Sequence, residues 1–116
     1  MKLQFVVLTF VTLSLMGAAF ALAHDCSHDG TVQALRECVE HAAAEGHIDN
    51  PGITRSLLAK LDAAEAAIDR GQSSAAINKL EAFIREVEAQ AGKHIVAEHA
   101  QHLVEHAELV IQALGG

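Results

Sequence analysis

Histidine is the residue type in this sequence that is best suited to do chemistry. The densest set lies in the run EHAQHLVEHAE, where His99, His102 and His106 are spaced i, i+3 and i+7. On a helix these three side chains fall within about 60° of one another, and they form a stripe beside the apolar stripe that contains Leu103. All eight histidines lie in the region 24–116, and they are His24, His28, His41, His47, His94, His99, His102 and His106.

Neutral imidazoles on adjacent helical turns can chelate a borderline metal ion such as zinc, copper or nickel. The spacing therefore predicts a metal site formed by His99, His102 and His106. The alternative is a polar helix face at the edge of the core. Histidines with glutamate neighbours on such a face would titrate at about pH 6–7 and could make the surface responsive to pH.

The two cysteines, Cys26 and Cys38, predict a disulfide bond if the chain is exported, because oxidising compartments favour disulfides. The bond would close a loop of about a dozen residues and would stabilise the fold by roughly 2–3 kcal/mol. A zinc site formed by Cys26, His28, Cys38 and His41 is the alternative, although its spacing matches no standard pattern. A mature N-terminal His24 could also chelate metal through its amine and its ring.

No motif in the sequence indicates an enzyme. The chain has no HExxH motif, no Glu-x-x-His pair of the di-iron bundles, no CxxCH haem motif and no phosphate-binding loop. The serines are explained better as tail, helix-face and capping residues. We therefore expect no catalytic residues and no cofactor, apart from the zinc, copper or nickel that the histidines could bind.

Two adjacent helices are predicted for residues 50–93. Asn50 followed by Pro51 is a typical helix start, and Gly71 is a typical helix stop. Ser73 or Ser74 is expected to cap the following helix, which Gly92 ends. Between these signals, apolar residues recur at spacings of three and four, as on one face of a helix: Ile53, Leu57, Leu61, Ala64 and Ile68, then Ile77, Leu80, Phe83, Ile84 and Val87.

A further helix is predicted on each side of this pair. The first covers about Thr31 to Glu45, with Asp29 or Thr31 as its cap and Gly46 as its stop. The last covers about Ile95 to Leu114. Its apolar stripe consists of Val96, Ala100, Leu103, Ala107, Val110 and Leu114. Because short turns join neighbouring helices in an antiparallel manner, we expect an all-α, up-down bundle of four helices.

The two central helices resemble the FIMAH domain, a helical module of secreted bacterial proteins. The runs GITRSLLAKLDAAEAAIDRG and AAINKLEAFIREVEAQAGKHI carry the resemblance, which extends from about Thr31 to Leu114. The resemblance implies a non-catalytic module, and it supplies no catalytic residues. The matched positions are mostly core and turn residues, and they are Gly52, Ile53, Ser56, Leu57, Lys60, Leu61, Gly71, Ala76, Leu80, Phe83, Ile84, Gly92 and Lys93.

Residues 1–23 are predicted to be a secretory signal peptide. Lys2 precedes an apolar run, and Ala21-Leu22-Ala23 matches the small-x-small cleavage pattern. A retained membrane anchor is the alternative, because the run is almost long enough to span a bilayer. If the signal peptide is cleaved, residues 24–30 are a polar N-terminal tail. Residues 31–116 are then a single domain in the periplasm or the extracellular space.

The composition of the predicted mature chain, residues 24–116, restricts its partners. It contains 7 Lys and Arg against 15 Asp and Glu, a net charge of −8. That charge argues against nucleic acid and against anionic membranes. Phe83 is its only Phe, Tyr or Trp, so it offers few rings for stacking on sugars or bases. An exported interaction module, binding an unknown protein or itself, is the first hypothesis, and a histidine-rich metal-binding protein is the second.

Overall fold

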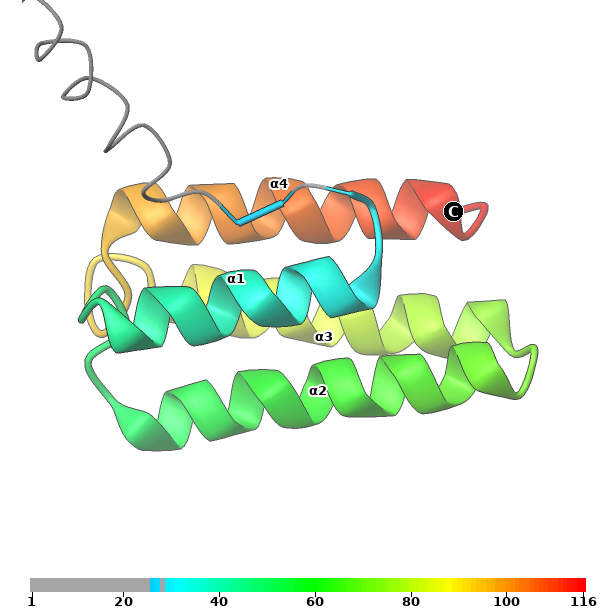
Figure 1. Ribbon diagram of the computed structural model, residues 1–116, viewed down its shortest axis with the longest axis horizontal. Helices are drawn as coiled ribbons and strands as arrows, with labels where there is room; N and C mark the ends of the chain where they lie inside the picture. The colour runs from blue at the N-terminus through cyan, green and yellow to red at the C-terminus, as the bar shows by residue number, and fades with distance from the viewer. Residues whose placement is uncertain (1–25, 28) are drawn as a thin grey trace, which may run out of the picture.

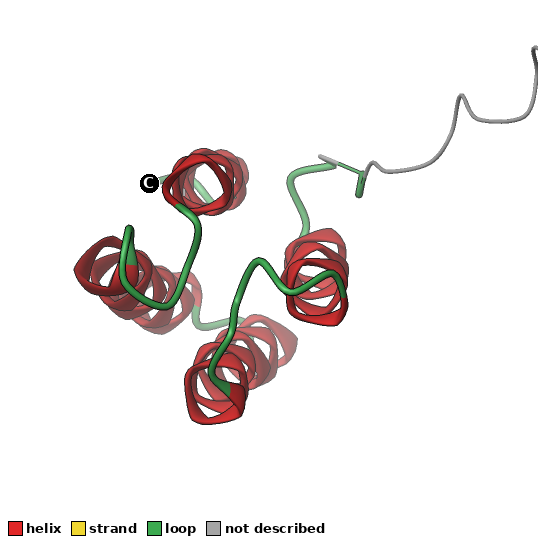
Figure 2. Cartoon of the chain, turned by 90° about the vertical axis from the view of Figure 1, so that its left-hand side faces the viewer, coloured by secondary structure: helices red, strands yellow, loops and turns green. Residues whose placement is uncertain are grey.

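The computed structural model describes residues 26, 27 and 29–116, and these form an antiparallel bundle of four helices (Figure 1). The predicted signal peptide lies outside the described residues. The helices are α1 (Val32–Ala44), α2 (Pro51–Asp69), α3 (Ser73–Gln90) and α4 (Ala97–Ala113). Each helix packs against its neighbours in chain order, and α4 packs against α1 to close the bundle (Figure 2). The predicted fold class is confirmed.

The apolar stripes of the four helices meet in one core. Phe83 is the largest fully buried side chain in this core, and its exposed fraction is 0%. The central part of each predicted stripe is buried, whereas Ile53, Ile68, Ile77 and Ile84 are half-buried. The other large core residues are Leu35, Val39, Leu57, Leu61, Leu80, Val87, Ile95, Leu103 and Val110.

The same glycine-containing motif ends α1 and α2. In α2 the Gly71 N–H donates to the Ile68 carbonyl at 2.9 Å, and the Gln72 N–H donates to the Ala67 carbonyl at 2.8 Å. Gly71 has a φ of 75°, a left-handed conformation that glycine adopts without strain. Gly46 plays the same part after α1, with a φ of 85°. Both predicted helix stops are therefore confirmed.

The start of α3 differs from the prediction. Gln72 occupies the N-cap position, no side chain caps the helix there, and Ser73 is already helical. Gln72 serves both helices, because its N–H closes α2 while its carbonyl accepts the Ala76 N–H at 3.1 Å. The predicted cap at Ser73 or Ser74 is therefore wrong.

Removal of the Asn50 cap should destabilise the protein measurably. The Asn50 Oδ1 atom accepts the Gly52 N–H at 2.8 Å and the Ile53 N–H at 3.2 Å. Asn50→Ala leaves these N–H groups without that acceptor and should lower the free energy of unfolding by about 1 kcal/mol. Urea denaturation would measure the loss. Gln72→Ala is the matched control and should cost less than about 0.5 kcal/mol, since Gln72 makes no capping bond. Equal costs for both variants would contradict the assignment.

The connections at one end of the bundle pair with each other. The Val96 N–H donates to the His47 carbonyl at 3.0 Å, and the Asp49 N–H donates to the His94 carbonyl at 3.0 Å. Ile48 and Ile95 face each other in this short antiparallel bridge, and both are buried. The bridge closes this end of the core and fixes the α1–α2 connection against the start of α4.

This bridge also explains why the predicted start of α4 is wrong. Helix α3 ends at Gln90, and the predicted stop Gly92 follows its C-cap residue with a φ of 77°, so that prediction is confirmed. Helix α4, however, begins at Ala97 rather than at Ile95. The intervening backbone pairs with the α1–α2 connection instead of continuing either helix. Ile95 consequently enters the core, whereas Val96, which was expected in the apolar stripe, is 46% exposed.

Two residues that carry the family resemblance bind the same carboxylate. Ser56 Oγ donates to Glu86 Oε1 at 2.8 Å, and Lys60 Nζ donates to the same oxygen at 2.9 Å. All three side chains are partly buried. The polar positions of the matched pattern therefore join α2 to α3, which is a structural role. None of the described helices is long and apolar enough to cross a membrane.

Candidate functional site

The histidines gather at a cleft between α1 and α4. The cleft has a volume of about 230 Å³, and the Cys26–Cys38 disulfide forms part of its wall. The paired connections bring the α1–α2 connection to the first turns of α4, so side chains far apart in the sequence meet here. The titratable side chains that line the cleft are His41, Glu45, His47, His99, His102 and His106.

The closest contact in the cleft is a stack of two imidazole rings. The rings of His47 and His99 lie 3.7 Å apart between centroids, with an angle of 17° between their planes. The ring of His102 lies 6.3 Å from that of His99 and is tilted by 38°. The His47 carbonyl also accepts the Val96 N–H, and this bond holds the α1–α2 connection beside the first turn of α4. His41 Nε2 on α1 and Oε2 of Glu45, the C-cap residue of that helix, approach to 3.9 Å.

The pKa of His99 is lowered from its ordinary value. The largest cause is burial, which disfavours the charged ring, and the second and third are repulsion from His47 and His102. The negative charges of Glu98 and Glu45 oppose this shift without cancelling it. These contributions together favour the neutral form of the His99 ring.

The lowered pKa of His99 predicts that acid destabilises the fold. Between the folded pKa and the unfolded value of about 6.5, the unfolded chain binds more protons than the folded chain does. The free energy of unfolding should therefore be greatest above about pH 6.5 and should fall as the pH is lowered below it. Urea midpoints measured from pH 8 to pH 5 would show the fall, and it should be smaller in His99→Gln. The same pH dependence in wild type and variant would contradict the prediction.

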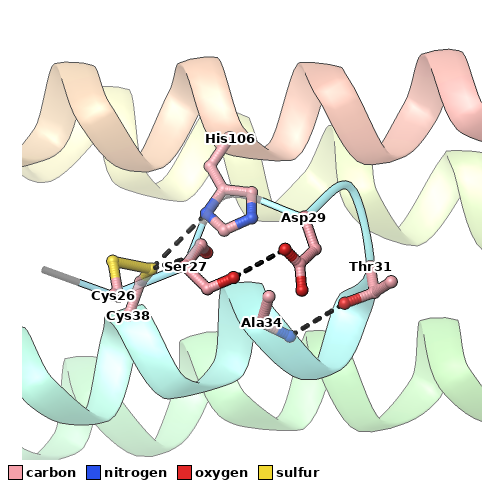
Figure 3. Close-up of a disulfide and its surroundings, with 7 residues drawn as sticks. All are labelled: Cys26, Ser27, Asp29, Thr31, Ala34, Cys38 and His106. Carbon is pink, nitrogen blue, oxygen red and sulfur yellow. Dashed lines mark hydrogen bonds between the residues drawn. A yellow bond between two sulfur atoms is a disulfide. The ribbon is translucent and has the colours of Figure 1, made fainter.

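His106 lies deeper than the other cleft histidines. It is 1% exposed, and its Nδ1 atom lies 3.4 Å from Cys38 Sγ (Figure 3). A disulfide sulfur carries no hydrogen, so the Nδ1–H group must be the donor in this contact. The disulfide thus has two effects here. It holds the N-terminal segment against α1, and it provides an acceptor for a buried ring nitrogen.

The structure separates the three histidines that the sequence places on one stripe. His99 and His102 are near each other in the outer part of the cleft, whereas His106 is part of the buried interior. The expectation that the stripe runs beside the apolar residues is therefore wrong at His106. The reason is that the N-terminal segment and its disulfide cover this part of α4. The assignment of His99, His102 and His106 as metal ligands stays a prediction.

Sequence reasoning did not place His47 at this site. His47 and His99 are far apart in the chain, and no local pattern indicates that they stack. The sequence feature that came nearest to indicating a role for His47 was the large number of histidines. His94 is not among the cleft residues, since its Nδ1 atom pairs with Asp49 Oδ1 at 2.9 Å on the surface. His24 and His28 lie outside the described residues.

The predicted Cys26–Cys38 disulfide is confirmed. The alternative zinc site with two cysteine ligands is wrong for this oxidised form, because disulfide sulfurs are not thiolates. In the part of the chain that the structure describes, no three His, Cys, Asp or Glu side chains are arranged to hold a metal ion with the rings as they lie.

The fold and the disulfide together define a small helical module that is cross-linked by one disulfide bond. A family model described as the FIMAH domain matches residues 32–112, which include all of α1, α2 and α3 and nearly all of α4. The chain therefore belongs to the FIMAH domain family, a non-catalytic family of helical modules in bacterial surface proteins. No curated protein and no solved structure matched the chain.

Proposed function

We propose that this protein is an exported, non-catalytic interaction module that binds another protein of the bacterial envelope or extracellular space. The observation that carries the proposal is the family match over residues 32–112, since the family is found in bacterial surface proteins. The Cys26–Cys38 disulfide supports export, because such bonds persist in oxidising compartments.

Export is tested by fractionating the cells that produce the protein and sequencing its N-terminus. We expect the protein in the periplasm or the medium, with His24 as its first residue. Retention in the cytoplasm with residues 1–23 still attached would reject the export part of the proposal.

Partner binding is tested by site-specific photo-crosslinking in the same cells. A photoreactive residue replaces Leu109, an apolar side chain on α4 that is 43% exposed, and the matched position is Lys79 on α3, which is also exposed. A discrete adduct from one position and not from the other would identify a binding face. If a set of exposed positions on all four helices gives no adduct, and the protein sediments as a monomer, the interaction proposal fails.

A second candidate function is metal binding in the same compartment. The cleft favours it, because five histidines from α1, α4 and the α1–α2 connection line one small volume. Elemental analysis of the exported, untagged protein, purified without chelator, tests this function. We expect stoichiometric zinc, copper or nickel, and a metal-free protein that binds none of these ions more tightly than about ten micromolar would reject it.

A further inference from the structure

We propose that His47, His99 and His102 together bind one divalent transition-metal ion in the outer part of the α1–α4 cleft. The inference rests on the second proposed function and names its site. It differs from the stripe on α4, because it takes one ligand from the α1–α2 connection and excludes His106. A bound ion would fasten that connection to α4.

Two ring separations, His47 to His99 and His99 to His102, are close to those that a metal site requires. A tetrahedral zinc ion lies about 2.0 Å from each ligating nitrogen and about 3.2 Å from each ring centre, so ligand rings are centred about 5 Å apart. The observed separations of 3.7 Å for His47 and His99 and 6.3 Å for His99 and His102 lie on either side of this value. Shifts of about 1 Å, by opening the stack and turning His102 inward, would bring the rings to ligand spacing.

Two of the three rings are placed where such shifts are easy. His102 is exposed on α4, and His47 lies on a connection rather than inside a helix. The bond between its carbonyl and Val96 holds the His47 backbone in place but leaves its side chain to rotate. The rearrangement therefore requires changes in side-chain rotamers and no change in the bundle.

His99 has a ring nitrogen that lacks a partner. Its Nδ1 atom is buried and makes no hydrogen bond to any of the described residues. A buried polar atom without a partner is costly, and coordination would satisfy it.

The charge around the cleft suits a cation. Glu45 lines the cleft, and its charge acts on His99. No Lys or Arg is among the residues that line it. We assign to the Glu45 carboxylate the role of balancing the charge of the ion. His106 is left out because it is buried and its Nδ1 atom faces the disulfide.

The test is calorimetric titration of the exported, processed protein with zinc, copper and nickel, each alone, at pH 7.5. We expect one ion per chain, with a Kd below one micromolar for at least one metal. His47→Gln should weaken that affinity at least tenfold, and so should His99→Gln and His102→Gln. His94→Gln is the matched control, since His94 lies at the same end of the bundle but outside the cleft, and it should leave the affinity unchanged.

A second measurement keeps the test independent of folding defects. The melting temperature of the wild-type protein should rise with the bound metal, and His47→Gln should show no such rise relative to its own metal-free melting temperature. Tight binding that survives His47→Gln would overturn this site while leaving the metal-binding function intact. Binding that His94→Gln weakens equally would show adventitious chelation by surface histidines and overturn the site as well. A wild-type protein that binds no metal rejects both the site and the second function.

Discussion

Phe83→Ala is expected to lower the free energy of unfolding by about 3–5 kcal/mol. Phe83 is the largest fully buried side chain and the only Phe, Tyr or Trp in the predicted mature chain. The core cluster that contains Phe83 also contains Ala42, Ala64, Ala100 and Ala107, whose side chains are too short to fill the space that the ring leaves. The loss is a large part of the stability of a small domain, which is typically about 5–15 kcal/mol.

Thermal and urea denaturation of Phe83→Ala, followed by circular dichroism, would measure this effect. The melting temperature should fall by more than about 10 °C, given the shift per kcal/mol that is usual for a domain of this size. Val96→Ala is the matched control, because Val96 is an apolar residue of similar chemistry that is 46% exposed, and it should change stability by less than about 0.5 kcal/mol. The loss in the free energy of unfolding for Phe83→Leu should lie between those for Phe83→Ala and Val96→Ala. A loss below about 1.5 kcal/mol for Phe83→Ala would show that Phe83 is not tightly packed in the core.

Removal of the Cys26–Cys38 disulfide is expected to cost about 2–3 kcal/mol. The bond joins residues 12 apart, and its loss frees the N-terminal segment in the unfolded chain and in the folded chain. We expect the larger structural effect along α1 and α4, because the bond joins the segment to Cys38 on α1 and contacts His106 on α4 (Figure 3). Cys26→Ser combined with Cys38→Ala is the suitable variant, since a serine at the buried position 38 would add an unpaired hydroxyl.

The variant and the reduced wild-type protein should unfold at the same urea concentration. Hydrogen exchange should then rise more in α1 and α4 than in α2 and α3, which pack against each other more extensively than α1 and α4 do. A loss of less than about 1 kcal/mol, or an equal rise in exchange across all four helices, would show that the disulfide does not hold the segment in place.

The sequence by itself determined the helical elements of this protein. Asn50 caps α2, Gly46 and Gly71 end α1 and α2, and Thr31 Oγ1 accepts the Ala34 N–H at 3.1 Å to cap α1. These signals act between residues no more than about five apart, so they can be read without knowledge of the fold. Short turns between four such elements leave the antiparallel bundle as the natural arrangement, and a chain with two cysteines offers one possible intramolecular pair.

The tertiary structure alone decided the start of α4 and the composition of the cleft. The bridge between Ile48 and Ile95 joins segments that are distant in the chain, and it forms only once the helices have brought both connections to the same end of the bundle. That bridge overrides local helical preference at Ile95 and Val96 and brings His47 onto His99. The burial of His106 likewise depends on the N-terminal segment, which the disulfide holds on α1 and which covers part of α4. Helix periodicity describes one face of one helix, and it contains no information about which other element will cover that face.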